Sequence, residues 1–361
     1  MLEFRPPKRK KIVIFDGHGS EHVSMCLPKK SYVILHTRYE KINFFILFKC
    51  LLNLKFKYCD YLKEFINYVK PKILLTYIDN NYFFYQIKFK FLKKISLQNG
   101  HRTELSQDFF YQIKNKKLNL NSDFIFLHCH SIAKLYPKYI KTSIKVFGSL
   151  RSNLTKISKK KIYTLGYVST WRSTNLQHRL YKDYTWEDWL ETDKILLRNL
   201  KMFCENKKIK LHVIGCANEK ESEKEKLFYD EMLGRKYSFI PNNNKRNVYS
   251  LADKFKALVG NDSTLLYENF GRGNKTAFFA YRSKEYPFNT RKFGWPGNIK
   301  EDGNFWTTKK DLGSFSKTLD YVLKCEKKNW EKNYKKYYPH VMSYDANNSK
   351  FSKLIKQLLK N

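Results

Sequence analysis

Short runs of apolar residues alternate with segments of helical spacing along most of this 361-residue chain. Three of these runs, in the first half, are residues 11–15 (KIVIF), 32–35 (YVIL) and 73–77 (ILLTY). They are apolar almost without interruption, which is typical of parallel strands in a sheet that helices cover on both faces. Strands that alternate with helices form βαβ units, so the sequence predicts an α/β fold built on parallel sheets.

A second series of the same kind follows a polar, lysine-rich stretch at residues 151–161, which we interpret as a linker. The strands expected in this half are residues 162–168, 210–214, 237–240, 257–259 and 276–281. Two successive series favour two Rossmann-like domains that face each other across a cleft. The expected division is an N-terminal domain at 1–152, a C-terminal domain at 153–330 and a helical tail at 331–361.

The chain carries 70 Lys and Arg against 33 Asp and Glu, a formal net charge of +37. Only 13 of the basic residues are arginines, whereas proteins that read nucleic acid rely on the planar arginine fork. Lysines are spread along the whole chain, as a genome biased towards A/T-rich codons would produce. We therefore expect no specific nucleic-acid partner, and the alternatives are codon bias or a basic face attracted to anionic lipid.

Residues 42–56 form the most apolar stretch, but Asn and Lys interrupt it, and a bilayer span needs about 18 apolar residues or more. The stretch would suit a helix that lies on a membrane surface, but a core helix of an α/β domain is the favoured interpretation. Residues 1–11 are charged and lead directly into a strand, so no secretory signal is evident. The expected protein is cytoplasmic, either in solution or peripheral at a membrane.

The seven cysteines are odd in number and widely spaced, and none belongs to a CxxC pair. This favours reduced thiols and predicts neither a zinc ribbon nor a thioredoxin-like site. His128 and His130 flank Cys129, but neighbouring residues of a strand point to opposite faces, so the triplet is interpreted as structural. We expect no metal site and no cofactor.

The polar residues that follow a strand in the second half form the strongest candidate site. Ligands of open α/β sheets bind beyond the carboxyl ends of strands, where helix N-termini offer free N–H groups and a positive dipole end. Asn261, Asp262, Ser263 and Thr264 stand at such a junction, and Glu268 lies one helical turn further on, where it could bind a ribose or sugar diol. The same residues also fit an ordinary N-cap beside a solvated Glu268, and spacing alone leaves both interpretations open.

Loops after the strands of the first half offer candidate acid–base groups. Asp16 and His18 follow the first strand, and Asp79 follows the third. Carboxylates and histidines can act as general bases, and histidine titrates near neutrality. Each also has a plainer interpretation, because loop histidines are often incidental and Asp79 also fits a cap of the next helix.

Further polar residues of the first half are candidates for the acceptor side of a cleft. They are Asn80, Gln98, Asn99 and Arg102. Asn99 precedes a glycine, a pair that equally marks a simple turn. Arg151 stands where the two domains should meet, where it could face a phosphate or hold the hinge.

Two common nucleotide-binding fingerprints are absent from the sequence. It contains neither GxGxxG, typical of Rossmann dehydrogenases, nor GxxxxGK[ST], typical of P-loop NTPases. A nucleotide would therefore have to be held by other residues.

Five short motifs occur in a fixed order along the chain. They are Asp79-Asn80-Asn81, Gln98-Asn99-Gly100-x-Arg102, Gly148-Ser149-x-Arg151-x-Asn153, Ser169-x-Trp171-Arg172 and Asp262-Ser263-Thr264-x-x-Tyr267-Glu268-x-x-x-x-Gly273. In order and spacing this set resembles a bacterial family of surface-polysaccharide biosynthesis transferases, found with lipopolysaccharide O-antigen and capsule genes. The resemblance spans roughly residues 13–306.

The resemblance implies a GT-B-like fold, in which the C-terminal domain generally holds a nucleotide-activated donor and the N-terminal domain holds the acceptor and the base. Carried over, the donor would be bound by Asn261, Asp262, Ser263, Thr264, Glu268 and Arg151. The catalytic candidates are Asp16, His18 and Asp79, and the acceptor-side candidates are Asn80, Gln98, Asn99 and Arg102. The sequence lacks the strongly Gly-rich donor loop of many GT-B enzymes, which leaves the nucleotide open.

The function expected from these observations is a glycosyltransferase of O-antigen or capsule assembly, acting on a glycan or lipid-linked acceptor. The chain has no DxD motif, so the expected reaction uses no metal, and the enzyme would work in the cytoplasm or at the inner face of the inner membrane. The alternatives on the same fold are a nucleotide-sugar 2-epimerase and a transferase of alditol phosphate from a CDP-alditol. A non-enzymatic alternative is a basic protein that binds nucleic acid or a membrane surface.

Overall fold

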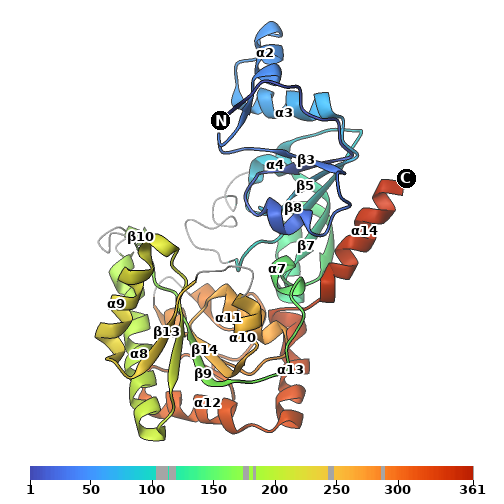
Figure 1. The fold of residues 1–361 in the computed structure, drawn as a ribbon. Coiled ribbons are helices and arrows are strands. Elements are labelled where there is room, and N and C mark those ends of the chain that lie inside the picture. The colour runs from blue at the N-terminus through green and yellow to red at the C-terminus, as the bar shows by residue number, and fades with distance from the viewer. Residues whose placement is uncertain are drawn as a thin grey trace.

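The computed structural model describes residues 1–102, 113, 119–173, 179–181, 184–242, 248–285 and 289–360. They form two six-stranded sheets in which every pair of neighbouring strands is parallel. Helices pack around both sheets, which lie one above the other in Figure 1. The α/β fold with parallel sheets is therefore confirmed. We call the first sheet and its helices the N-lobe and the second sheet and its helices the C-lobe.

The N-lobe sheet contains the three strands named for the first half and three further strands. In order across the sheet, its strands are β3 (Tyr32–Leu35), β2 (Ile12–Phe15), β5 (Ile73–Thr76), β6 (Lys93–Leu97), β7 (Leu120–Leu127) and β8 (Ile140–Val146). Its helices are α1 (Ser20–Ser24), α2 (Phe44–Leu52), α3 (Tyr58–Val69), α4 (Tyr82–Gln86), α6 (His130–Ala133) and α7 (Leu150–Asn153). A small parallel ribbon pairs β1 (Leu2–Glu3) with β4 (Ile42–Asn43).

The C-lobe sheet has β9 and β14 at its centre. In order, its strands are β13 (Tyr237–Ile240), β12 (Leu211–Ile214), β9 (Tyr163–Val168), β14 (Phe255–Gly260), β15 (Thr276–Phe279) and β16 (Trp306–Thr307). Its helices are α8 (Trp186–Lys207), α9 (Ser222–Leu233), α10 (Val248–Ala252), α11 (Thr264–Gly271), α12 (Leu312–Lys324) and α13 (Lys327–Val341). Beside it, β10 (Arg179–Tyr181) pairs with β11 (Tyr184–Thr185). Single 3₁₀ turns occur at Tyr136–Lys138, Glu219–Glu221, Tyr281–Lys284, Asn289–Arg291 and Ala346–Asn348.

Both faces of the N-lobe sheet are covered by apolar packing, which explains its continuously apolar strands. Along β2, Val13 and Phe15 belong to one buried cluster, while Ile12 and Ile14 belong to another. Successive side chains of a strand point to opposite faces, so the two clusters lie on the two sides of the sheet.

Helix α4 is short, and a buried lysine lies at its C-terminal end. α4 ends at Gln86, and its C-cap residue Ile87 is extended. The Nζ of Lys94 donates to the carbonyl oxygens of Tyr85 (2.9 Å) and Ile87 (2.7 Å). A buried ammonium thus satisfies carbonyl groups that further helical turns would otherwise occupy.

The C-terminal helix α14 (Ser349–Lys360) returns to the N-lobe after the C-lobe is complete. Its buried residues Phe351 and Ile355 are four apart, so they share one helical face, and they join the cluster that contains Ile12 and Ile14. Figure 1 shows α14 alongside the N-lobe. The chain therefore crosses between the lobes twice.

Gly148 marks one of these crossings and gives a testable prediction. Its φ is +89°, and a Cβ there would lie 2.1 Å from the carbonyl oxygen of Ser343. Gly148→Ala should therefore lower the free energy of unfolding by about 2 kcal/mol or more, measured by urea denaturation. Gly273→Ala is the control, because Gly273 has a similar φ of +84° but its Cβ would meet nothing closer than 3.9 Å. Equal losses in the two variants would contradict the steric argument.

Candidate functional site

The carboxyl edges of the two sheets meet at helix α11. The backbone N–H of His101, after β6, donates to Thr264 Oγ1 at 3.4 Å, and the His101 ring stacks on Tyr267 at 4.7 Å. Ser149, after β8, donates its hydroxyl proton to Glu268. His101 and Ser149 lie in loops that follow strands of the N-lobe, and α11 follows β14 of the C-lobe, so the lobe junction is built where ligands of such sheets bind.

Glu268 is buried at this junction, with only 6% of its surface exposed. Its Oε1 accepts hydrogen bonds from Ser149 and from the Tyr249 hydroxyl (3.0 Å). Burial raises the pKa of this carboxyl, although the neighbouring Ser149 and Arg151 oppose the shift. Among the described residues both hydrogen bonds go to Oε1, which leaves Oε2 for a ligand. The solvated Glu268 of the simple capping interpretation is excluded.

The side chains at the start of α11 do not cap the helix. Ser263 is the N-cap residue, but its side chain accepts no capping hydrogen bond. Asp262 is turned towards two arginines, and Thr264 receives the His101 N–H. Among the described residues, no side chain caps the first N–H groups of α11, so a ligand anion could bind there.

Two buried polar atoms of the predicted donor residues have no hydrogen-bond partner among the described residues. They are Oδ1 of Asn261 and Nε of Arg151. Burial alone would lower the pKa of the Arg151 guanidinium, but Tyr249 and Glu268 outweigh it and raise that pKa. An acceptor and a donor left unpaired at the lobe junction are expected where a polar ligand binds.

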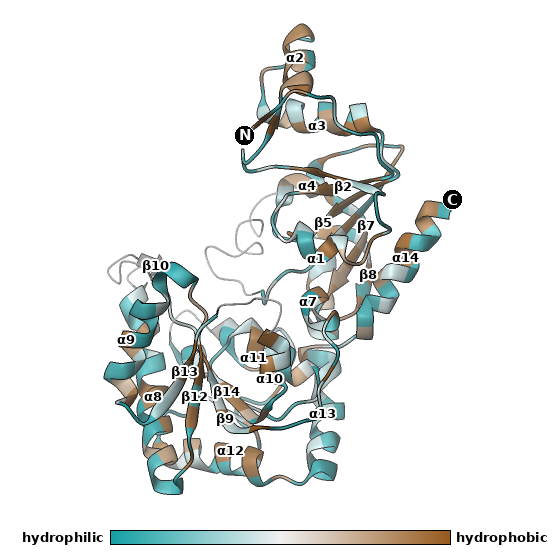
Figure 2. Ribbon diagram, viewed as in Figure 1, coloured by the Kyte–Doolittle hydropathy of each residue, from teal (hydrophilic) through white to brown (hydrophobic). Residues whose placement is uncertain are grey.

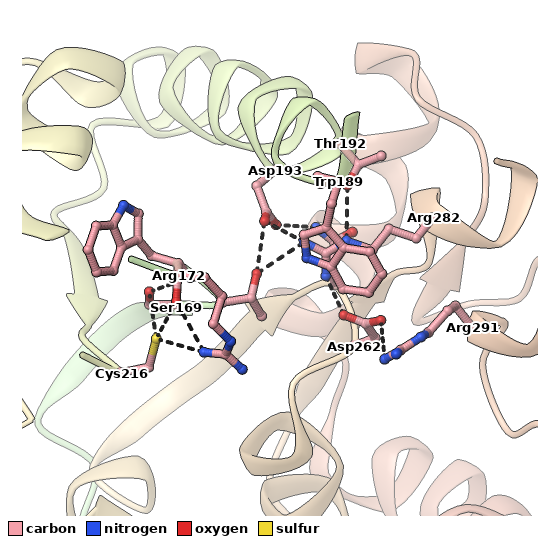
Figure 3. Close-up of polar contacts among 12 residues, drawn as sticks. Ser169, Arg172, Trp189, Thr192, Asp193, Cys216, Asp262, Arg282 and Arg291 are labelled. Carbon is pink, nitrogen blue, oxygen red and sulfur yellow. Dashed lines mark hydrogen bonds and ion pairs between the residues drawn. The ribbon is translucent and has the colours of Figure 1, made fainter. Parts of the chain in front are cut away.

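A buried charge network lies beside the start of α11 (Figure 3). At its centre, the Arg282 guanidinium, with 1% of the residue exposed, donates to the carboxylates of Asp193 and Asp262. It also lies 3.8 Å from the ring centroid of Trp189. Arg291 donates to Asp262 at 3.0 Å from the other side. The network fixes Asp262, and with it the turn that leads into α11.

This network sets the charge of Asp262. Burial alone would raise the pKa of the Asp262 carboxyl, but the guanidiniums of Arg282 and Arg291 hold it below its usual value. Asp262 is therefore an anion with two internal cationic partners. This arrangement suits a residue that holds the turn before α11 in place. Direct contact between Asp262 and a donor stays a prediction.

The predicted acceptor-side residues largely bind one another. Asp79 is fully buried and accepts from Arg102 Nε (2.9 Å), the Asn99 N–H (3.1 Å) and the Tyr136 hydroxyl. Gln98 donates to the Gly100 carbonyl oxygen at 2.8 Å. The structure thus brings Asp79, Gln98, Asn99 and Arg102 together as a closed cluster, whereas Asn80 is exposed. Asp79 has little freedom to act as a base.

The loop after β2 holds the other two catalytic candidates. Asp16 is buried, accepts the His18 N–H at 2.9 Å and receives Arg38 Nε at 3.0 Å. His18 is exposed. A Cβ on Gly19 would lie 2.2 Å from the Tyr77 ring, so this glycine lets the loop approach Tyr77 closely. Of the three catalytic candidates, His18 alone presents an exposed side chain.

A pocket of about 700 Å³ lies between the lobes on the side of α6 and α13. Its polar lining is basic, with Lys134 and Lys138 from the N-lobe and Lys336 and His340 from the C-lobe. No Asp or Glu is among its lining residues. The pocket therefore has the charge to attract an anion.

The charge network could not be predicted from the sequence, although one of its members, Asp262, was a predicted donor residue. Asp193 and Trp189 lie inside the long helix α8, where their four-residue spacing on one face resembles ordinary amphipathic packing. Arg282 follows β15 after only two residues, and its place at the carboxyl edge of the sheet was the signal available. Ser149 and His101 were within the quoted motifs, but nothing in their spacing indicated contacts with the other lobe.

His101 predicts a pH dependence of stability. Burial, aided by Arg291, lowers the pKa of the His101 imidazole to about 3 from 6.5. The folded protein keeps this imidazole neutral, so the free energy of unfolding is unaffected by it above pH 6.5. The free energy of unfolding then falls as the pH drops towards 3, by about 2 kcal/mol at pH 5. Urea unfolding at pH 7 and pH 5 should show that His101→Phe removes this part of the slope, since Phe keeps the stacking on Tyr267. The exposed His130→Phe is the control, and an unchanged slope in His101→Phe would refute the prediction.

Comparison with models of protein families shows which family this chain belongs to. The model of a family described as "putative O-antigen biosynthesis protein" matches residues 95–359. The chain belongs to this family. The resemblance inferred from the motifs is thus confirmed, and it supports a role in surface-polysaccharide biosynthesis. No curated protein matches the chain.

Solved structures with the same architecture include three enzymes. The wall teichoic acid polymerase TagF shares 14% identity over 99% of this chain and 90% of its own, with a TM-score of 0.54. Sucrose-phosphate synthase from Thermosynechococcus elongatus shares 11% over 98% and 100%, with a TM-score of 0.55. UDP-GlcNAc 2-epimerase from Neisseria meningitidis, solved with UDP-GlcNAc, shares 11% over 98% and 100%, with a TM-score of 0.53. These similarities establish the fold, and the GT-B-like architecture expected for this O-antigen family member is confirmed.

In the described part of this O-antigen family member, no helix is both long enough and apolar enough to cross a membrane. Within the same residues, no group of three or more His, Cys, Asp or Glu is arranged to hold a metal ion.

Proposed function

We propose that this O-antigen family member is a glycosyltransferase that moves a sugar from a nucleotide-activated donor to a glycan or lipid-linked acceptor. The observation that carries the proposal is Glu268, a buried carboxylate at the meeting of both carboxyl edges, one oxygen of which accepts no hydrogen bond from a described residue. A buried charged group is costly unless it is fully paired, so an incompletely used one favours a functional role.

On this proposal, Glu268 Oε2 accepts hydrogen bonds from a sugar or ribose diol. The donor phosphates lie at the uncapped start of α11, near Ser263, Thr264 and the half-buried Arg151. Phosphate carries the charge that a helix N-terminus and a guanidinium favour. These donors are fixed before the reaction, so they stabilise the charge that develops on the departing nucleotide without a metal.

The proposed base is His18, because its side chain is exposed while its backbone N–H is held by Asp16. The acceptor hydroxyl oxygen bonds to the anomeric carbon, and the bond from that carbon to the phosphate oxygen breaks. The hydroxyl proton passes to the His18 imidazole, and the nucleotide leaves with the bonding electron pair. The basic pocket between the lobes supports an acceptor that itself carries phosphate.

Product analysis tests this function against its alternatives. The protein is incubated with each nucleotide sugar, and with CDP-glycerol as a CDP-alditol, with and without a lipid-phosphate acceptor. A glycosyltransferase releases the nucleotide and glycosylates the acceptor in the same amount. A 2-epimerase changes the sugar without an acceptor, and an alditol-phosphate transferase releases CMP from CDP-glycerol. Either of the latter results would replace the proposal.

A further inference from the structure

Helix α2 presents apolar residues on two opposite faces. Ile46 and Cys50, four residues apart, are buried against the rest of the N-lobe. Phe44, Phe48 and Leu52 are also spaced by four, yet they are 44%, 51% and 68% exposed. The outward face of a helix on a soluble domain is ordinarily polar, so this face is not explained by the packing of the lobe.

Other exposed apolar side chains surround this face. β1 pairs with β4 directly before α2, and the rings of Phe4 and Phe44 are 5.5 Å apart. Nine of the sixteen exposed large apolar side chains of the described chain belong to this region. We call these nine residues the apolar tip: Met1, Leu2, Phe4, Phe44, Phe48, Leu51, Leu52, Leu54 and Phe56. Figure 2 shows α2 as a largely hydrophobic element at the extremity of the N-lobe.

The charge around the apolar tip is mainly positive, and the one carboxylate between Leu2 and Phe4, that of Glu3, pairs with Lys41 at 3.4 Å. Residues 41–57 contain four lysines and no Asp or Glu. Glu64 of α3 pairs with Lys49 (3.5 Å) and Lys55 (3.1 Å), so one carboxylate faces two ammonium groups there. Lys57 is exposed beside Phe56. An apolar surface with a cationic border suits an anionic counterpart.

We propose that the apolar tip docks the N-lobe on the surface of an anionic lipid bilayer. Contiguous exposed apolar surface is rare on soluble proteins, and lysines beside aromatic and leucine side chains match the headgroup and acyl layers of a membrane. α2 has nine residues, far fewer than a span requires, so it would lie in the interface plane. A symmetric contact between two copies is disfavoured, because it would bring the lysines of one tip against those of the other.

This inference rests on the surface of the N-lobe and not on the activity of the lobe junction. If the proposed function also holds, docking would bring the acceptor side of the enzyme to a membrane in which a lipid-linked acceptor resides. Vesicle binding needs neither donor nor acceptor, so each proposal can fail without the other.

Sedimentation with vesicles tests the docking. Vesicles of phosphatidylethanolamine with roughly 30% phosphatidylglycerol provide the anionic surface, and phosphatidylcholine vesicles provide the neutral one. The unmodified protein should bind the anionic vesicles, and Phe48→Ser/Leu52→Ser/Leu54→Ser should bind them at least tenfold more weakly. The matched control is Met202→Ser/Leu227→Ser, which removes exposed apolar side chains of the C-lobe and should bind as the unmodified protein does.

A second measurement locates the contact directly. All six tryptophans lie at residue 171 or beyond, so Leu52→Trp adds the first in the N-terminal half. Its fluorescence should be quenched by brominated lipid in the anionic vesicles. Absence of vesicle binding by the unmodified protein, or equal binding by the triple variant, would overturn the proposal. So would a dimer in light scattering that the triple variant dissociates, because the tip would then join two copies.

Discussion

Replacing Arg282 by methionine should lower the free energy of unfolding by about 3–5 kcal/mol, because it leaves two buried carboxylates without their shared cation. Asp193 and Asp262 both accept from this guanidinium, and both are almost fully buried. Methionine keeps an unbranched apolar chain against Trp189, so the expected loss is electrostatic and not a loss of volume. Urea unfolding followed by circular dichroism measures it.

Arg291→Met is the matched control for this variant. Arg291 stacks on the same tryptophan at 4.9 Å and donates to the same Asp262, but its side chain is 22% exposed. Arg291→Met should lower the free energy of unfolding by about 1 kcal/mol. Adding Asp193→Asn to Arg282→Met should restore part of the stability by removing one unpaired charge. Equal losses in the two arginine variants would show that the network is not the electrostatic centre described above.

The second large effect concerns Glu268. Glu268→Gln keeps an oxygen that can accept from Ser149 and Tyr249 but loses the carboxylate that we propose for the donor diol. Donor affinity, measured by calorimetry, should fall roughly 10- to 100-fold, the value of a hydrogen bond to a charged group. Unchanged affinity would remove Glu268 from the donor site.

The same variant should be more stable than the original protein at neutral pH. Burial raises the pKa of Glu268 above its unfolded value of 4.5, so burial favours the protonated side chain. The stability that the protonated form gives is fully present below pH 4.5 and is lost as the pH rises through the folded pKa. The two proteins should therefore have equal free energies of unfolding at about pH 4. The stability advantage of Glu268→Gln should grow as the pH rises to 7. A variant that is more stable but binds less donor is the signature of a carboxylate kept for function.

His18→Asn provides the complementary control for Glu268→Gln. An exposed loop residue contributes little to stability or to donor contacts, so donor affinity should be unchanged. The transfer rate should fall roughly 100-fold or more, as expected when a general base is removed. A loss of donor affinity in His18→Asn, with the rate on bound donor unchanged, would reassign the residue to binding.

The strands were predictable because each is a short apolar run bounded by polar residues. Residues 73–77 and 237–240 were placed within one residue of β5 and β13. The helix α9 was not predicted, since it is rich in charged residues and buries only a few side chains, whereas most of α13 falls within the helical tail expected at 331–361. β16 has only two residues, too few to show any period.

The candidate site was predictable only as a set of loops at strand ends. Position along the chain placed Asn261–Glu268 and the loops after β2, β5 and β6 at the carboxyl edges, because parallel strands share one direction. It could not reveal that Asp79 would be enclosed by Arg102 and Tyr136, or that Asp262 would face two arginines. Such pairings depend on side chains that meet from distant parts of the sequence, and spacing carries no information about them.

The most direct test of the central claim, a nucleotide-sugar donor site at Glu268, is a thermal-shift measurement. The protein and Glu268→Gln are compared with UDP-, GDP-, dTDP-, CDP- and CMP-linked donors. A donor at 100 times its dissociation constant adds about 2.7 kcal/mol to the free energy of unfolding, which raises the midpoint temperature of unfolding measurably. We predict a shift with one class of nucleotide that is strongly reduced in Glu268→Gln. A midpoint that no donor moves, or a shift that is the same in both proteins, would contradict the claim.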